Sequence, residues 1–437
     1  MKSFKTILFI LFAITSSLPL SAQNQTNADS LSLSDILKQV MINYPSIKKS
    51  EQDLLAADAR IGLAKSAYYP DISINSSYSH IGPVSTITMP GLGVFSFYPA
   101  DNFSASLNYN QTLYDFGKTA KSVAYENQSK DLVNMSGTQL KQKLSLVVVN
   151  IYYSIVFLQE ALKIKDEQIS TLNQHLHFIE KKVATGSATQ YELLTTQVRI
   201  SAIENQKTDV LTAIKVQCSQ LNSLLGKPEN TALLVKKELQ TIEAVVPTDS
   251  LMNLAVKSRN EMKMAAQKTM LSELHYKTVG MQNNPVFNVF ASGGVKNGYT
   301  PDINEQKMNY VLGLGLRIPL FDATRTKYSR MQAKTEIESS KEDAELCRRN
   351  IANEVVESQA NIASALQKIT QSELQLQQAQ KAYHLAETSF KSGVITNLEL
   401  LDSSTSLSEA GLSVLKAKID YSLSILKLKI AVGVAIY

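Results

Sequence analysis

The chain has 437 residues and a formal net charge of +5, with 44 lysines and arginines against 39 aspartates and glutamates. This balance is too even to indicate a nucleic-acid-binding protein. Glycine and proline are sparse, at 17 and 11 residues, so we expect long regular elements. The two cysteines, Cys218 and Cys347, have no CxxC partner and indicate no disulfide framework.

Residues 1–22 have the pattern of a secretory signal peptide. Lys2 and Lys5 form a positively charged start, an apolar run follows, and small residues lead up to Ala22. The apolar run is shorter than the roughly 20 residues that a transmembrane helix needs, and no later segment reaches about 18 uninterrupted apolar residues. We therefore expect cleavage after Ala22, a mature chain of residues 23–437, and no transmembrane helix.

The mature chain is predicted to form one unit made of two tandem repeats, residues 31–226 and 249–433. The stretches VATGSATQYELLTTQ and FKSGVITNLELLDSS place a glycine and a leucine pair 207 residues apart. The same offset relates the apolar heptad positions of two long helical patterns, whereas an offset of 215 relates Pro70 to Pro285. A single change in length between Pro70 and Tyr114 accounts for both offsets, as expected of an internal duplication.

Each repeat is predicted to contain a helix, two strands, a long helix and a further helix. Alternation with period two predicts strands near 71–80, 102–114, 285–295 and 308–319. In the last strand, Tyr310, Leu312, Leu314, Leu316 and Ile318 share one apolar face. Residues 81–100, rich in glycine and proline, are expected to form a loop. The heptads of the long helices predict coiled-coil packing against neighbouring helices.

The repeated glycines indicate two helix reversals, near 186–189 and 393–396. Gly186 and Gly393 can adopt the left-handed conformation that ends a helix. Thr189 and Thr396 can each cap a new helix, with a glutamate three residues later that completes a capping box. We expect two helical hairpin tips at one end of a rod. The alternative is a kink in one continuous helix.

The four predicted strands are too few to close a barrel, for which about eight is the practical minimum. Their apolar faces suit an outer-membrane barrel shared between chains, with eight strands from two chains or twelve from three. A soluble pair of β-hairpins is the alternative.

This order of elements resembles the TolC-type outer-membrane efflux factors over essentially the whole mature chain. The Gly-x-x-Thr-x-x-Glu-Leu-Leu turns and the junctions TLYDFGK and IPLFDATR carry the resemblance. It implies a mainly α fold with a small membrane β part. Three chains would form a twelve-stranded β-barrel with four strands from each, continued by a long α-helical coiled-coil tunnel.

The resemblance also implies a function. The protein would be a homotrimeric exit duct in the outer membrane, in contact with outer-membrane lipid, with its helices in the periplasm. It would serve a tripartite efflux or type I secretion system, with a periplasmic adaptor (membrane-fusion) protein and an inner-membrane pump as partners. The residues that would contact the adaptor are at the two tips: Gly186, Ser187, Thr189, Gly393, Val394 and Thr396.

Acidic residues just past the second turn ring the closed tunnel end in this family. Glu399 and Asp402 occupy that place and are the candidate channel gate. No basic residue lies between Ser392 and Leu401, so an ionic partner for the gate has to come from another helix.

Motifs of enzymes and metal sites are missing from the sequence. HExxH, GxSxG and GxxxxGK do not occur. His175 and His177 are two positions apart on a predicted helix and do not share a face, so they do not indicate a zinc pair. We expect neither an enzyme nor a bound cofactor or metal. The alternative to the duct is a structural or adhesive coiled-coil surface protein without transport activity.

Overall fold

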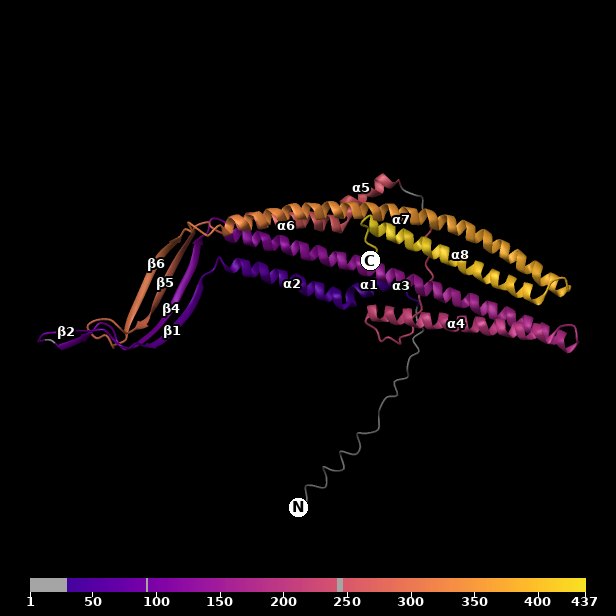
Figure 1. The fold of residues 1–437 in the computed structure, drawn as a ribbon, viewed down its shortest axis with the longest axis horizontal. Helices are drawn as coiled ribbons and strands as arrows, with labels where there is room; N and C mark the ends of the chain where they lie inside the picture. Colours follow the sequence, from indigo (N-terminus) through magenta and orange to yellow (C-terminus); the bar gives the residue numbers. More distant parts are fainter. Residues whose placement is uncertain (1–29, 92, 242–246) are drawn as a thin grey trace, which may run out of the picture.

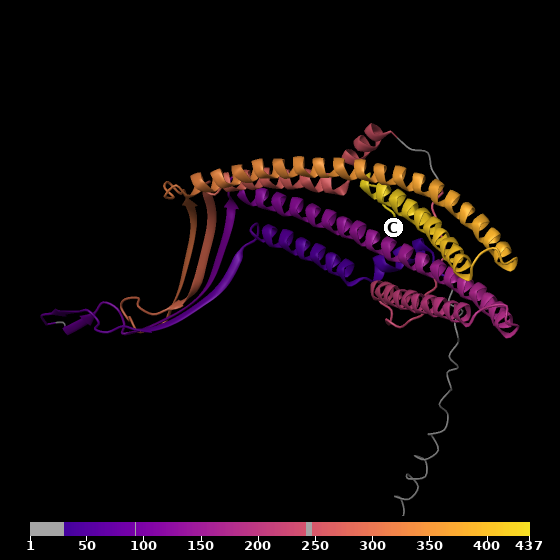
Figure 2. The same cartoon turned by 45° about the vertical axis from the view of Figure 1, so that its right-hand side comes forward.

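The computed structural model describes residues 30–91, 93–241 and 247–437, so the predicted signal peptide lies outside the described residues. Long helices run side by side as a rod, and a small sheet continues the rod at one end (Figure 1). The same arrangement appears in the turned view, in which the hairpin turns lie at the end of the rod opposite the sheet (Figure 2).

Two helices of 67 residues are the longest elements of the rod. At a rise of about 1.5 Å per residue, each is about 100 Å long. Helices α2 and α4 pack along one of them, α3, and helices α6 and α8 pack along the other, α7 (Figures 1 and 2). The helix bounds are α1 Leu33–Asn43, α2 Pro45–Ser66, α3 Lys118–Ala184, α4 Gln190–Leu225, α5 Thr248–Ser258, α6 Asn260–Gly280, α7 Arg325–Lys391 and α8 Asn397–Ala431.

The sheet has four antiparallel strands in the order β1-β4-β5-β6. The strand bounds are β1 Asp71–His80, β4 Asp101–Tyr114, β5 Val286–Lys296 and β6 Lys307–Arg317. Strands from the two halves of the chain meet at the centre, where β4 pairs with β5. Strands β1 and β6 are therefore the two free edges.

The segment 81–100 departs from the loop expected for it. It contains a two-stranded hairpin of β2 Thr86–Met89 and β3 Gly93–Ser96, which forms a separate sheet. The alternating residues span only four positions in each strand and lie among prolines and glycines. Proline and glycine favour a loop when the sequence is judged locally. For this reason the short alternation of apolar and polar residues did not indicate strands.

The main hydrophobic core lies where α1, α3, α4 and α8 meet. Val148, Tyr152 and Ile155 of α3 are completely buried in it. The Tyr152 hydroxyl donates a hydrogen bond of 2.6 Å to the carbonyl oxygen of Lys236. By length and composition alone α3 has one stretch apolar enough to cross a membrane, but half of that stretch is buried inside the protein. The buried half of this stretch packs in the main hydrophobic core.

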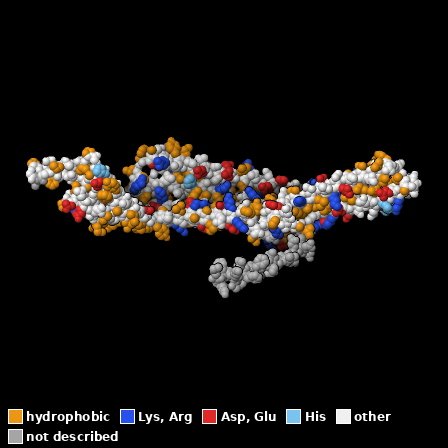
Figure 3. Space-filling model, turned by 90° about the horizontal axis from the view of Figure 1, so that it is seen from below, with side chains coloured by type: hydrophobic (Ala, Val, Ile, Leu, Met, Phe, Trp, Pro, Cys, Tyr) orange, Lys and Arg blue, Asp and Glu red, His pale blue; other side chains and the backbone are white. Residues whose placement is uncertain are grey.

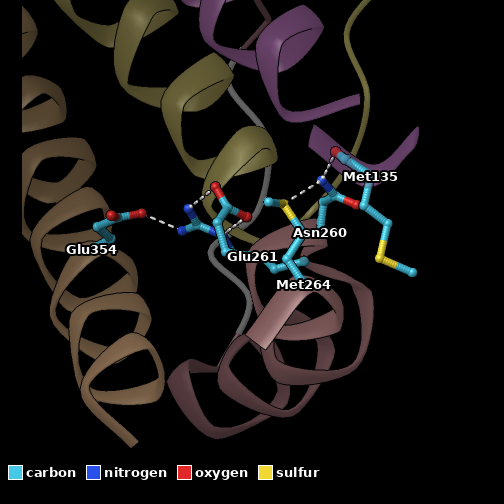
Figure 4. Close-up of polar contacts among 6 residues, drawn as sticks. Met135, Asn260, Glu261, Met264 and Glu354 are labelled. Carbon is cyan, nitrogen blue, oxygen red and sulfur yellow. Dashed lines mark hydrogen bonds and ion pairs between the residues drawn. The ribbon is translucent and has the colours of Figure 1, made fainter. Parts of the chain in front are cut away.

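A buried arginine fixes the break between α5 and α6. The Arg259 guanidinium pairs with Glu261 at 2.9 Å and also with Glu354 of α7 (Figure 4). Burial by itself would lower the pKa of Arg259, but the two carboxylates raise it above its ordinary value. The neighbouring Asn260 donates to the carbonyl oxygen of Met135 at 2.6 Å. The junction is thereby tied to both long helices.

Candidate functional site

One face of the four-stranded sheet is apolar and uncovered. Because paired residues of neighbouring strands share a face, the register aligns Ile74 with Leu107, and Val289 with Leu314. Ile74 is 77% exposed and Leu312 is 74% exposed. The large apolar side chains on this face are Ile72, Ile74, Tyr78, Phe103, Leu107, Tyr109, Phe287, Val289, Val295, Met308, Tyr310, Leu312, Leu314 and Leu316.

The opposite face of the sheet is polar. The hydroxyls of Ser77 and Ser104 lie 2.8 Å apart, and the amide of Asn288 donates to Asn110 Oδ1 at 3.2 Å. Phe290 is a large apolar exception. Its ring lies over Gly313, where an added Cβ would come within 2.3 Å of it. Phe290 thus covers part of the face of β6 that carries Gly313.

The sheet is incomplete at both edges. Among the described residues, strands β1 and β6 each pair with one neighbour only, so each leaves a row of backbone N–H and C=O groups without sheet partners. In the space-filling view, charged side chains gather along the helical rod and are few at the sheet end (Figure 3). An apolar face combined with two unpaired edges is a surface to which further strands can be added.

The other end of the rod carries the two helix reversals. Gly186 has φ of 71° and Gly393 has φ of 74°, both in the left-handed region. No atom lies within 4 Å of a Cβ built on either glycine, so backbone conformation rather than crowding favours glycine here. The amide of Ser187 donates to Lys182 O at 2.8 Å, and that of Val394 donates to Ser389 O at 2.9 Å. These bonds close both helix ends as Schellman motifs.

The next helix begins with a threonine cap at each tip. The Thr189 hydroxyl accepts from the amide of Glu192, and the Thr396 hydroxyl accepts from the amide of Glu399. A capping box was expected at both tips, but among the described residues only α8 has its second half, in which the amide of Thr396 donates to Glu399 Oε2 at 2.7 Å. The α4 cap therefore depends on the Thr189 hydroxyl alone.

The side chains or backbone of all six residues expected at an adaptor contact are exposed. Val394 is 76% exposed and is the largest apolar side chain among them. The six exposed positions are Gly186, Ser187, Thr189, Gly393, Val394 and Thr396. The surface they form is accessible in the single chain.

The two acids expected at the gate have different partners. Glu399 binds its own helix start, and the backbone N–H and hydroxyl of Thr396 lower the pKa of its carboxyl. Asp402 accepts a hydrogen bond of 2.6 Å from the guanidinium of Arg199 on α4. Arg199 is thus a basic partner from another helix. The sequence gives no local signal for it, because it lies 203 residues before Asp402.

A buried asparagine at the start of α8 was missed in the sequence. Asn397 is only 4% exposed, and its side-chain amide donates to Thr196 Oγ1 at 3.0 Å and to Glu192 O at 3.2 Å. Its Oδ1 lies 2.6 Å from Nε2 of His175 on α3. When Nε2 carries the proton, it donates a hydrogen bond to this oxygen. Asn397 therefore joins three helices, and it ties the two hairpins of one chain together.

The surroundings of His175 disfavour its charged form. It is half-buried, and its ring packs against that of Phe390 with centroids 5.1 Å apart. Burial lowers the pKa of the imidazole, which the hydrogen bond with Asn397 opposes and the nearby Lys182 reinforces. Protonation of His175 would place a charge between the helices at the tips.

Comparison with known sequences finds one family along most of the chain. The family described as "Outer membrane efflux protein" matches residues 36–227 and 251–434. The outer membrane protein TolC of Vibrio cholerae is 20% identical over 92% of this chain and 90% of its own length. The proteases secretion protein PrtF of Dickeya chrysanthemi is 21% identical over 86% of this chain and 82% of its own length.

Solved structures agree with the sequence comparisons. A crystal structure of CusC, from work on its folding and transmembrane channel formation, superposes on this chain with a TM-score of 0.76 at 18% identity. The match covers 92% of each chain. The outer membrane protein VceC of Vibrio cholerae superposes with a TM-score of 0.75 at 16% identity, over 93% of this chain and 97% of its own. At these identities the structures show the fold alone.

Proposed function

Because the chain belongs to the outer membrane efflux protein family, we propose that three copies form the outer-membrane exit duct of a tripartite efflux or type I secretion system. The observation that carries the proposal is the four-stranded sheet, with its uncovered apolar face and two unpaired edges, at the end of a long helical rod. An adhesive coiled-coil protein would need neither the apolar face nor the open edges.

Strand length and number support a barrel of three chains. A tilted strand crosses a bilayer with about 9–11 residues, and β1, β5 and β6 have 10, 11 and 11 residues. Three chains supply twelve strands. At a spacing of about 4.8 Å and a tilt of about 40°, twelve strands make a barrel of about 12 Å backbone radius. The apolar face would contact lipid and the serine- and asparagine-rich face would line the lumen.

The helices would continue this barrel into the periplasm as a tunnel about 100 Å long. The two tips of each chain then lie at the far end of the tunnel, six tips in the trimer. We assign their exposed residues to contact with a periplasmic adaptor that couples the duct to an inner-membrane pump. The positive φ of Gly186 and Gly393 gives the turns a fixed shape that such a contact can recognise.

Glu399 and Asp402 would form the gate at the tip end. In a trimer they place six carboxylates around one opening, three of them paired with Arg199, and the remaining negative charge concentrates cations. The Arg199–Asp402 pair holds α8 against α4 within each chain. Side chains at this pair are 31% and 61% exposed, so the pair is worth at most about 1 kcal/mol and can be separated when the end opens.

Conductance in planar bilayers tests both the duct and the gate. We expect the purified protein to form a pore that divalent and trivalent cations block from the tip side. The double variant Glu399→Gln, Asp402→Asn keeps a capping acceptor at Glu399 and removes both charges, so it should conduct without cation block. A pore whose block is unchanged in this variant would exclude the two acids as the gate. Absence of any pore would contradict the duct itself.

A further inference from the structure

The hairpin β2–β3 has no assigned role, and its composition sets it apart from the rest of the surface. Residues 81–100 contain no aspartate, glutamate, lysine, arginine or histidine. The connection between β5 and β6, at the same end of the sheet, carries Asp302 and Glu305. The hairpin projects from the sheet away from the helical rod (Figures 1 and 2).

The hairpin has one apolar face. Ile87 pairs directly with Phe95, so both side chains lie on the same side of the ladder. Met89 is two residues further along β2 and shares that side. Phe97 directly follows the end of β3, next to these residues in the chain. The opposite side carries Thr86, Thr88, Ser96 and the smaller Val94. Alternation of this kind is typical of antiparallel strands with one face covered and the other in water.

Nothing in the described part of the chain covers the apolar face. Ile87 is 41% exposed and Phe97 is 62% exposed, with Met89 and Phe95 between these values. A contiguous group of large apolar side chains on a projecting strand pair is costly in water and marks a contact surface.

The position of the hairpin places this surface outside the bilayer. Strand β1 already has the ten residues needed to cross, and it ends at His80, whose Nδ1 lies 2.8 Å from Asp101. Lys296 and Lys307 pair with each other at the same end of β5 and β6, three residues nearer the rod in the register, opposite Ser104. The hairpin begins beyond these ionisable groups. Folding back into lipid would carry it past them, so another protein surface is the better partner.

We propose that the apolar faces of three β2–β3 hairpins, one from each chain, pack against one another over the outer mouth of the barrel. This inference rests on the trimer of the proposed function. Symmetry brings identical groups together around the axis, where like charges would repel. A segment without charge avoids this repulsion, whereas the β5–β6 connection with its two acids would not.

The hairpin is long enough to reach the axis. Each arm of the 20-residue segment has about ten residues, which at about 3.3 Å per residue extend roughly 30 Å, against a barrel radius of about 12 Å. The three hairpins are tethered to one barrel, so their effective concentration is on the order of millimolar and a small apolar contact suffices. The cluster would restrict the outlet at the end opposite the carboxylate gate.

Site-specific cross-linking tests the packing in the assembled protein. Cys218 and Cys347 are replaced by alanine, and Ile87→Cys or the matched control Val94→Cys is introduced. Cells are treated with a short bis-maleimide, and native mass spectrometry reports the number of chains before denaturing gels report covalent links. We expect both variants to be trimers by native mass spectrometry. On denaturing gels, chains should be covalently linked in Ile87→Cys and not in Val94→Cys.

Three results would overturn the proposal, and they are distinguishable. A trimer without links at Ile87→Cys, or with equal links in both variants, shows that the apolar faces do not meet. Quenching of a fluorophore at Phe97→Cys by brominated lipid shows that the hairpin lies in the bilayer instead. A sample without trimers refutes the proposed assembly first and the hairpin cluster with it. Adding Phe95→Thr to Ile87→Cys should also abolish the link, because it removes the paired apolar side chain.

Discussion

Replacing Asn397 by leucine should loosen the tips without unfolding the rod. The change keeps the volume of the side chain but removes its hydrogen bonds to Thr196, Glu192 and His175. Thr196 still donates to Glu192 O at 2.8 Å, so the main group left without a partner is the His175 ring nitrogen. The lost bonds to Thr196 and Glu192 cost about 1 kcal/mol each, and the His175 donor left without its partner costs about 1 kcal/mol more, which gives a loss of about 3 kcal/mol.

Amide hydrogen exchange of the protein in detergent measures this loss locally. Since about 1.4 kcal/mol corresponds to a factor of ten, exchange in the first turns of α4 and α8 should accelerate by about 100-fold. The strands and the core around Tyr152 should exchange as in the parent. Asn173→Leu, at an exposed position of α3, is the control and should change nothing.

Combining the Asn397 change with a change at His175 distinguishes loss of the hydrogen bond between them from a general disturbance of the tips. In a double-mutant cycle, Asn397→Leu and His175→Ala should not add, because each removes the same hydrogen bond. Unchanged exchange at the tips of Asn397→Leu, or full additivity with His175→Ala, would refute the assignment of Asn397 as the link between hairpins.

Three further perturbations follow from the same structure. Burial lowers the pKa of His175 in the folded protein, so on acidification His175 is protonated in the unfolded chain at a higher pH than in the folded one. Its contribution to the stability of the tips is therefore complete above about pH 6.5 and is lost as pH falls through the lower pKa of the folded state. Tip exchange, corrected for intrinsic rates, should rise on acidification in the parent and stay flat in His175→Gln. Replacing Gly186 or Gly393 by valine forces a β-branched residue to positive φ, which costs about 1–3 kcal/mol. The amount of adaptor recovered in a pull-down should fall while the assembly persists. Unchanged recovery of the adaptor would contradict the assignment of the tips as its contact. Leu314→Lys places a charge on the apolar face and should cost about 2–4 kcal/mol per chain in membrane folding assays, whereas Ser292→Lys on the polar face should insert normally.

Local patterns in the sequence were sufficient for the parts of the fold that repeat over a few residues. The alternation through Leu312 and Leu314 identifies an apolar strand face because side chains of a strand alternate with period two. Gly186 and Gly393 identify helix ends because few other residues tolerate positive φ. Each of these signals lies within one element and needs no knowledge of its neighbours.

Contacts between distant segments could not be read in the same way. Arg199 meets Asp402, and His175 meets Asn397, across more than 200 residues of chain. Nothing in the residues around Asn397 distinguishes a buried polar link from an ordinary first-turn asparagine. The β2–β3 hairpin was missed for a different reason, because its two short strands lie among prolines and glycines that favour a loop.

The central claim, that three chains complete one duct, is tested most directly by native mass spectrometry of the protein extracted from membranes in mild detergent. Four strands with two unpaired edges and an uncovered apolar face cannot close alone. We predict a single dominant species with the mass of three chains. A stable monomer or dimer as the dominant species would contradict the twelve-stranded barrel and the duct built on it.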